Sequence, residues 1–450
     1  MNNNELTRRD FVRTATATAA AATWLGSTGS APAVAAAADK PAALGGTPAH
    51  AGDWPGWPQW DEAWEPKIVD VLRSGAWSPA GDDGGPVNDF EQAYAKLLGA
   101  KDCIATSSGT AALLTALAAT GIDAGDEVIV SPFTFIATYN AVLAHKALPV
   151  LADTDPATLT IDPSSIESRI TERTRAIVPV HIYGMPCDMD PINAIAKKHN
   201  LIVVEDACQA WLAEYHGQKC GTLADLGCFS FQNSKHLPSG EGGAVTGTNA
   251  EYLDRARSYH DCGRAHGTHQ GRGNFSRGLN YRLTHYQGMM LLEQLEKLVS
   301  DTELRRRNAD RLTAGLKQIP GIEVVRLPGN SRAVWHLYAF RYNPEAFHGL
   351  PRVKFQRALN REGVPCSSGY TEQYFDGLFD EAIGSRGFQR LFPAERLKAY
   401  RASFDELKGN KQVCETTVAL SQRLLLGEPG DIDNIVEAIQ KIKTHSASLV

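Results

Sequence analysis

Two residues that could do chemistry follow apolar runs of the sequence. Asp206 ends the run LIVVED, and Lys235 lies in the polar stretch QNSKH directly after GCFSF. In open parallel sheets, ligands bind outside the carboxyl ends of the strands, so both side chains belong to one crevice if both runs are parallel strands. Taken singly, each residue has an ordinary explanation, because an aspartate at a strand end often caps a helix and a loop lysine is usually solvated.

Small polar residues precede a third candidate element, TSSGTAALLTAL. Small residues at a helix start expose free backbone N–H groups and the positive end of the helix dipole, which together form an anion site. An ordinary Ser/Thr cap on a core helix explains the same residues. After the run EVIVSP come Phe133 and Phe135, which either pack in the core or stack on a ligand.

The elements that must position these residues are short apolar runs that alternate with helix-length patterns. The runs are EVIVSP, LPVLAD, RAIVPVH, LIVVEDA, GCFSF and GGAVTG. Runs of four to six apolar residues without alternation suit strands that are covered on both faces. Because helical patterns such as 188–199 separate them, they indicate crossover units and a mostly parallel sheet in an α/β fold.

Helical spacing and a change of character divide the chain. Apolar residues recur at helical spacing over 87–98 and from about Gly288 to Leu316, and the segment GAKDCIA after the first of these reads as a turn. Beyond Pro320 come IEVVRL, WHLYAFRY and helical patterns near 352–362 and 431–443. We therefore expect a large domain over residues 81–320 and a smaller α+β C-terminal domain over residues 321–450.

Composition excludes several classes of protein. The 450 residues are 43% hydrophobic and 21% charged, which is typical of a folded chain of two or three domains. With 45 Lys+Arg against 51 Asp+Glu, the chain has no basic surplus that could bind a nucleic-acid backbone. It also contains no run of eighteen apolar residues, the length needed to span a membrane. The eight cysteines form neither a CxxC pair nor a Cys/His spacing, so we expect structural thiols and no metal site.

Residues 1–38 carry a pattern that lies outside the expected fold. In TRRDFVRT, Arg8 and Arg9 are adjacent, and the weakly apolar TATATAAAATWLG and small-residue sites near Ala33 and Ala35 follow. This order resembles a twin-arginine signal peptide and implies an exported protein, periplasmic or secreted. That route carries folded proteins, so unpaired cysteines would be buried before they reach an oxidising compartment. A frayed N-terminus on a cytoplasmic enzyme is the alternative.

Residues 39–80 form an expected N-terminal arm that is rich in tryptophan. Its indoles are Trp54, Trp57, Trp60, Trp64 and Trp77. Large aromatic side chains mostly supply buried area, so the arm should pack its rings on the body or on a second subunit. Stacking of these rings on a ligand is the alternative.

Five short motifs follow one another along the chain: SSGT, PFTF, EDACQA, FSFQNSK and GEGG. The phrases GIDAGDEVIVSPFTF, PVHIYGMPCDMD and GLNYR accompany them. Together they resemble the PLP-dependent sugar aminotransferases of the DegT/StrS group, over roughly residues 58–440. The resemblance implies a fold-type-I transferase with pyridoxal 5'-phosphate as its cofactor.

The resemblance also implies a role for each motif residue near the cofactor ring. Lys235 would bind the pyridoxal aldehyde as a Schiff base, and Asp206 would pair with the pyridinium nitrogen, which keeps the ring an electron sink. These two are the expected catalytic residues. Phe135 would stack on one face of the ring, and Gln209 would touch the other face or hydrogen-bond its hydroxyl.

A second group of residues would hold the phosphate. By resemblance, Gly109 and Thr110 at the helix start act together with Ser230. In family members the segment that carries Asn280 and Arg282 reaches the site of the neighbouring subunit. The resemblance therefore implies a homodimer in which these two residues act in trans.

The reaction implied by the resemblance is a transamination in two halves. An amino acid leaves its amino group on the cofactor, which then aminates a keto-sugar or a keto-cyclitol while Lys235 moves the proton. Some relatives replace the lysine and dehydrate their substrate, so the presence of Lys235 favours transamination. The segment EGVPCSSGYT (Glu362–Thr371) and the C-terminal helix look closer to the glutamine-using aminocyclitol branch, so glutamine or glutamate is the expected donor.

Some features depart from the family pattern. Gln232, Asn233 and His236 stand where relatives vary, which puts the acceptor side of the pocket in doubt. Export is also unusual for a largely cytoplasmic biosynthetic family. A PLP-bound sensing protein that lost turnover is the alternative from a different functional class, and the complete pair of Lys235 and Asp206 favours the enzyme.

Overall fold

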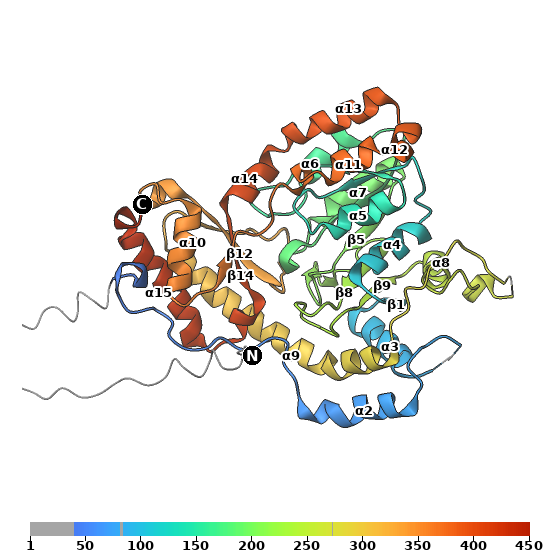
Figure 1. Cartoon of the computed structure of the whole chain (residues 1–450), viewed down its shortest axis with the longest axis horizontal. Helices are drawn as coiled ribbons and strands as arrows, with labels where there is room; N and C mark the ends of the chain where they lie inside the picture. The colour runs from blue at the N-terminus through green and yellow to red at the C-terminus, as the bar shows by residue number, and fades with distance from the viewer. Residues whose placement is uncertain (1–39, 82–83, 272) are drawn as a thin grey trace, which may run out of the picture.

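The computed structural model describes residues 40–81, 84–271 and 273–450. The six predicted apolar runs and one further strand, β1, form a seven-stranded sheet in the order β1-β9-β8-β5-β4-β2-β3 (Figure 1). Its strands are β1 (Asp102–Thr106), β2 (Glu127–Val130), β3 (Leu148–Leu151), β4 (Thr174–Val178), β5 (Ile202–Asp206), β8 (Leu226–Ser230) and β9 (Gly243–Gly247). Strand β9 is antiparallel to both of its neighbours, and the other pairs are parallel. The predicted α/β fold with a mostly parallel sheet is confirmed.

Strand β1 corrects one expectation, because the segment GAKDCIA is not simply a turn. Its second half enters the edge strand Asp102–Thr106, which pairs along its whole length with β9. Cys103, Ile104 and Ala105 are buried in this strand. The apolar triplet is too short to stand out in the sequence, and its pairing partner lies about 140 residues further along the chain.

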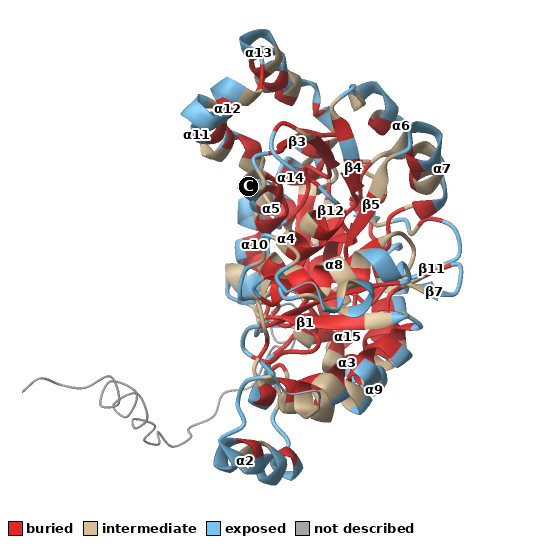
Figure 2. Cartoon of the chain, turned by 90° about the vertical axis from the view of Figure 1, so that its right-hand side faces the viewer, coloured by how far each residue is buried: buried red, intermediate tan, exposed pale blue. Residues whose placement is uncertain are grey.

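Helices cover both faces of this sheet, and Figure 2 shows its strands buried between them. One face carries α4 (Gly109–Ala119), α5 (Ala137–Ala144) and α8 (Ala250–His260). The opposite face carries α3 (Pro86–Leu98), part of α9 (His285–Leu316) and α7 (Met189–His199). This double cover explains why the strands are apolar at successive positions rather than at alternate ones.

The C-terminal part contains a second, antiparallel sheet in the order β10-β12-β14-β13. Its strands are β10 (Ile322–Val324), β12 (Leu337–Tyr342), β13 (Cys366–Ser367) and β14 (Thr417–Ser421), with α10 (Arg352–Arg361) and α15 (Pro429–Thr444) in the same apolar cluster. Helix α9 packs against α3 at one end and α15 at the other, so it belongs to both parts of the molecule (Figure 1).

The remaining α-helices and strands of the described residues are short. They are α2 (Glu65–Ser74), α6 (Pro163–Ile166), α11 (Leu378–Gly384), α12 (Arg386–Leu391), α13 (Ala394–Ala402), α14 (Lys408–Thr416) and the ribbon strands β6 (Glu214–Tyr215), β7 (Gln218–Lys219) and β11 (Ser331–Arg332). Within the described ranges, no helix combines the length and apolar character needed to cross a bilayer.

Residues 374–407 pack on the large sheet although they follow the start of the C-terminal part. The rings of Phe379, Tyr400 and Phe404 join the apolar cluster that contains β2 and α5, and the Tyr400 hydroxyl donates to the carbonyl of Pro149 at 2.8 Å. The chain therefore crosses back after β13 and returns through α14 to β14. The division of the sequence at residue 321 stays a prediction.

Candidate active site

A cavity of about 560 Å³ opens at the carboxyl end of β5, next to the loop that follows β8. Its size lies within the range of sites for small molecules and cofactors. Seven of the residues expected from the sequence line it: Gly109, Thr110, Phe135, Asp206, Gln209, Ser230 and Lys235. Strands β5 and β8 are parallel neighbours, so the predicted meeting of Asp206 and Lys235 in one crevice is confirmed.

The carboxyl group of Asp206 is held in one orientation at the base of the cavity. Its Oδ2 accepts a hydrogen bond from the Thr138 hydroxyl at 2.7 Å, and its Oδ1 accepts one from the backbone N–H of Cys208 at 3.2 Å. The Thr138 hydroxyl lies 2.8 Å from that of Thr134, and both threonines are buried. The carboxyl group is thus fixed from the side of α5 while it faces the cavity.

Glu205, the neighbour of Asp206 in the acidic pair, points the other way. Its carboxylate faces Nε2 of His181 at 2.9 Å and accepts three backbone N–H groups, from Gly221, Leu223 and Ala224. The side chain of Cys220 completes a buried group of three potential metal-ligating residues. Four donors already satisfy Glu205, which fits a role in holding the loop after β7 rather than a role in the cavity.

Lys235 lies in the loop after β8, beside the indole of Trp211. Its Nζ lies 5.8 Å from the centroid of the Trp211 ring. Burial lowers the pKa of the Lys235 ammonium below its ordinary value, and the acid Asp206 acts in the opposite direction. An amine of lowered pKa is more readily available as a nucleophile and proton carrier at neutral pH.

The N-terminus of α4, the candidate anion cradle, lines the cavity at the place where the sequence predicted an anion site. The Ser108 hydroxyl caps the helix by accepting the backbone N–H of Ala111 at 3.0 Å. A Cβ on Gly109 would lie 2.7 Å from the Cβ of Ser230, and a Cβ on Gly243 would lie 2.4 Å from the carbonyl oxygen of Ser108. These two glycines therefore allow the helix start to lie directly against the ends of β8 and β9.

Phe135 and Gln209 contribute to the wall in different ways. Phe135 lines the cavity with 55% of its surface exposed, so one face of its ring is available to a ligand. The Gln209 amide is held at both ends, because its Oε1 accepts the backbone N–H of Tyr183 at 2.8 Å and its Nε2 donates to the Tyr370 hydroxyl at 3.0 Å. Gln209 thus links β5 to the segment after β13.

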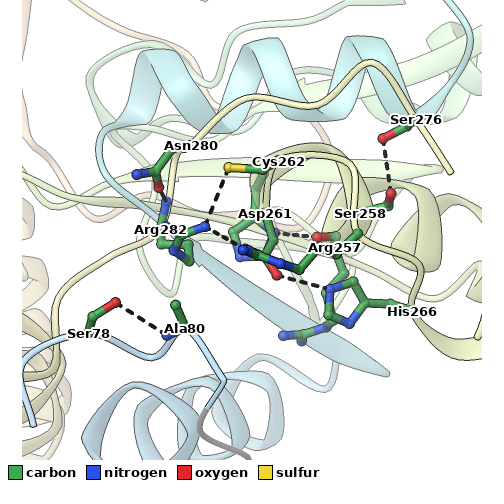
Figure 3. A network of polar contacts seen from close by, with 12 residues as sticks. Ser78, Ala80, Arg257, Ser258, Asp261, Cys262, His266, Ser276, Asn280 and Arg282 are labelled. Atoms are coloured by element: carbon green, nitrogen blue, oxygen red, sulfur yellow. Dashed lines mark hydrogen bonds and ion pairs between the residues drawn. The ribbon is translucent and has the colours of Figure 1, made fainter. Parts of the chain in front are cut away.

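Asn280 and Arg282 do not line this cavity. Figure 3 shows the Arg282 guanidinium turned toward Asp261, with 2.5 Å between Nη1 and Oδ1, and toward the Cys262 sulfur at 3.6 Å. Asn280 is exposed, and its Oδ1 accepts the backbone N–H of Arg282. Their backbone nevertheless runs beside the cradle, since Ser107 donates its N–H to the carbonyl of Tyr281. Their action in trans stays a prediction.

Sequence reasoning missed several residues of the site, and three of them, Thr138, His336 and Tyr370, carry polar groups from other elements to the cavity. Thr138 comes three residues after PFTF, in the first turn of α5. A polar residue so soon after this motif was the one signal that the sequence offered. His336 and Tyr370 come from the C-terminal part, and no local pattern connects them with Lys235. Burial, together with the cations Lys235 and Arg305, lowers the pKa of His336 well below its ordinary value, so its ring is neutral at pH 7.

The three residues that depart from the family pattern have different surroundings. Gln232 lines the cavity, and its Oε1 accepts both the backbone N–H and the hydroxyl of Ser234. Asn233 is exposed, whereas His236 is buried 5.2 Å from the Trp211 ring and 5.9 Å from the His336 ring, measured between centroids. Of the three, only Gln232 borders the cavity.

Comparison with known proteins identifies the architecture. The family model of the DegT/DnrJ/EryC1/StrS aminotransferases matches residues 58–388. An L-glutamine:2-deoxy-scyllo-inosose aminotransferase of Streptomyces paromomycinus is 36% identical over 91% of this chain and 98% of its own length. The solved aminotransferase of Psychrobacter cryohalolentis superposes with a TM-score of 0.75 at 32% identity, over 88% of this chain and 100% of its own. The ntda protein of Bacillus subtilis, solved with bound cofactor PMP, gives 0.70 at 27% identity, over 85% and 83%.

The support of Asp206 by Thr138 leads to a stability prediction. Replacing Thr138 with Val keeps the shape of the side chain but removes the hydroxyl that donates to Oδ2. Because a buried acceptor then loses its partner, we expect the free energy of unfolding in urea to fall by about 1–3 kcal/mol. Thr134→Val is the matched control, since its hydroxyl contacts that of Thr138 rather than the acid. Equal losses in the two variants would show that the bond to Asp206 contributes nothing.

Proposed function

Because the chain belongs to the DegT/DnrJ/EryC1/StrS aminotransferase family, we propose that it transfers the amino group of glutamine to a neutral keto-cyclitol with pyridoxal 5'-phosphate as its cofactor. The chain is an aminotransferase, and its fold is that of solved aminotransferases. The cavity that joins Lys235 and Asp206 to a helix N-terminus carries the proposal. The alternative of a sensing protein without turnover has no support among the relatives.

The chemistry of the cavity fits the proposed cofactor. Its anion cradle consists of the start of α4 at Gly109 and Thr110, with the Ser230 side chain against it. Helix N-termini of this kind bind phosphate groups through free N–H groups and the helix dipole. Lys235 offers an amine to an aldehyde, and Asp206 offers an oriented carboxyl group to a pyridine nitrogen. When bound, the cofactor supplies an electron sink for the negative charge that develops at the substrate carbon.

The residues of this chain divide the remaining work. Asp206, held by Thr138, would keep a proton at the pyridine nitrogen, and Phe135 would cover one face of the ring. Lys235 Nζ, once released from the aldehyde, would take the proton from the α-carbon of the donor and return it on the cofactor side. Burial favours its neutral form, which the first of these transfers requires.

The charge of the cavity favours a neutral acceptor over a nucleotide-linked sugar. Among its lining residues in the described ranges, Lys235 is the one Lys or Arg, while Asp206 and Glu241 are acidic. A nucleoside diphosphate would need several cations to compensate its phosphates, more than the one arginine that the dimer proposed below would add. A polyol needs hydroxyl and amide partners instead, and the wall offers Ser108, Thr134, Ser234, Gln232 and Tyr370.

Two observations support glutamine as the donor. The segment Glu362–Thr371 resembles the glutamine-using branch and brings Tyr370 to the cavity. Several relatives that cover nearly all of this chain carry L-glutamine and 2-deoxy-scyllo-inosose in their names.

The decisive experiment follows the absorbance of the purified enzyme with its cofactor. Glutamine should convert the lysine-bound form to the amine form, and 2-deoxy-scyllo-inosose should then restore the first spectrum. Glutamate should act as a weaker donor. Conversion by alanine or lysine but by neither glutamine nor glutamate would reject the proposed donor, and restoration by a nucleotide-linked keto-sugar alone would reject the proposed acceptor.

Substitutions at the two central residues should separate their roles. Lys235→Ala should still bind the cofactor through its phosphate but give no turnover. Asp206→Asn should retain the lysine-bound form but lose about 10²–10³-fold in kcat, because one strong electrostatic interaction with the ring nitrogen is lost. Borohydride reduction and peptide mapping should find the cofactor on Lys235, and a label on another lysine would refute the assignment.

We propose further that two chains form a symmetric dimer in which Asn280 and Arg282 complete the partner's cavity. They lie outside the cavity of their own chain, beside the exposed side chains of Trp77, Leu279 and Tyr286. Exposed apolar groups of this size next to a polar network are typical of an interface between subunits. Ser78 and Ala80 lie in the same region as Arg282 (Figure 3).

Subunit complementation tests this arrangement. Inactive Lys235→Ala and Arg282→Ala chains, mixed and allowed to exchange subunits, should regain about one quarter of the native activity. In a symmetric dimer, half of the random pairs are mixed, and each mixed pair then holds one complete site. If Arg282 acts within its own chain, no mixed pair has a complete site and activity does not return.

We also propose that residues 1–38 export the folded enzyme by the twin-arginine route. Arg8 and Arg9 lie outside the described residues, so this proposal depends on the sequence pattern alone. Replacing both arginines with lysine should retain the precursor in the cytoplasm, as measured by cell fractionation and N-terminal sequencing. Recovery of the native protein from the cytosol with an intact N-terminus would reject it.

A further inference from the structure

The N-terminal arm is fastened to the C-terminal part of the molecule by a buried carboxylate. Glu362, at the end of α10, is fully buried and accepts the backbone N–H groups of Ala42 at 2.5 Å and Ala49 at 2.8 Å. It also pairs with Lys441 on α15, with 2.8 Å between Nζ and Oε2. A buried carboxylate that loses one of its partners destabilises the fold, so the contacts of the arm with Glu362 contribute to the stability of the molecule.

Trp54 and Pro55 continue the attachment of the arm toward the cavity. The Trp54 indole stacks on the His50 ring, with centroids 4.0 Å apart, and its N–H donates to the carbonyl of Gly363 at 2.7 Å. Arg423 reaches the carbonyl of Pro55. In Figure 1 the blue arm leaves the region of α10 and α15 and follows α9 toward α2.

The arm then meets the active-site loop at Trp57. The Trp57 indole N–H donates to the backbone carbonyl of Lys235 at 3.1 Å, across 178 residues of sequence. The backbone N–H of Lys235 is satisfied within the loop by the carbonyl of Gln232. Trp57 therefore holds the backbone carbonyl of Lys235, while the backbone N–H of the same residue is held within the loop.

The same indole lies on a buried cation. The guanidinium carbon of Arg305 lies 5.0 Å from the centroid of the Trp57 ring, and Arg305 is fully buried with its Nε donating to Gln422. Burial lowers the pKa of Arg305 to about 10. The ring face of Trp57 thus stabilises Arg305 while its N–H serves Lys235, and these two roles use different parts of one side chain.

We propose that Trp57 is a positioning residue for Lys235 and that residues 41–57 form a strap that connects α10 and α15 to the active-site loop. The lysine must meet an aldehyde and later a substrate carbon, and the rate of such transfers falls when the reacting atoms are displaced. The strap limits that displacement by fixing the peptide from which the side chain extends. This inference rests on the role of Lys235 in the proposed function.

The test uses Trp57→Phe in the full-length enzyme with its cofactor. Phenylalanine keeps an aromatic ring over Arg305 but has no N–H to donate. Trp60→Phe is the matched control, because Trp60 belongs to the same arm, is half exposed and packs edge-on against Trp64. Amide hydrogen exchange is measured at Asn233, Lys235 and Ser239, whose N–H groups are bonded within the loop.

Exchange at these three amides should become about fivefold faster in Trp57→Phe and stay native in Trp60→Phe, the change expected from the loss of one hydrogen bond. In the donor half-reaction, kcat should fall about fivefold with KM unchanged, since the change affects the lysine rather than the binding of the donor. Equal exchange in Trp57→Phe and Trp60→Phe would overturn the proposal.

A third variant tests the strap as a whole. Trp54→Phe removes the bond to Gly363, and neither member of that bond belongs to the active-site loop. The amides of the active-site loop should exchange faster in this variant too. If they exchange at the native rate, the effect is limited to Trp57, and the proposal that residues 41–57 act as a strap is wrong. If no donor converts the cofactor of the native enzyme, the proposed function fails, while the exchange measurements still decide this inference.

Discussion

The close approach of the α4 N-terminus to the ends of β8 and β9 is the constraint on which the rest of the site depends. Gly109 and Gly243 make it possible, because a Cβ at either position would collide with Ser230 or with the Ser108 carbonyl. The anion cradle is thereby held against the strand that leads into the Lys235 loop. A phosphate bound at the cradle and an aldehyde that meets the Lys235 amine could then belong to one small molecule, which neither element could arrange alone.

Hydrogen-bond partners, rather than residue type, decide which polar groups around this crevice are available to a ligand. Glu205 and Asp206 are consecutive acids, yet four donors satisfy the first within the core, while the second faces the cavity with one oxygen held by Thr138. Alternation along β5 sends neighbouring side chains to opposite faces of the sheet, so one acid supports the fold and the other is available for chemistry.

Several segments of the C-terminal part, distant from one another in sequence, contact the cavity or the large sheet. Tyr370 reaches Gln209, His336 lines the wall, and the aromatic residues of the segment 374–407 lie on the large sheet. The N-terminal arm crosses in the opposite direction, from Glu362 to the Lys235 carbonyl. Residues of both parts of the molecule therefore line the cavity.

The amino-acid sequence by itself determined the strands β2 to β5, β8 and β9, the helices α3, α9, α10 and α15, and seven residues of the cavity. The elements follow from local physics, since unbroken apolar runs form covered strands and helical spacing forms amphipathic helices. Asp206 and Lys235 follow from polar residues at strand ends, whereas Gln209 and Ser230 came from the family resemblance. Strand β1 escaped notice because its apolar triplet is short and its pairing with β9 is distant.

Only the tertiary structure decided which groups support the reactive ones. Nothing local connects Thr138 with Asp206, Tyr370 with Gln209, or Trp57 with Lys235, since 68, 161 and 178 residues separate the members of these pairs. Each pair depends on where whole elements pack. A hydrogen bond acts over about 3 Å, so a contact of this kind exists only after the packing of the sheet, α5, the arm and the C-terminal part has placed donor and acceptor together.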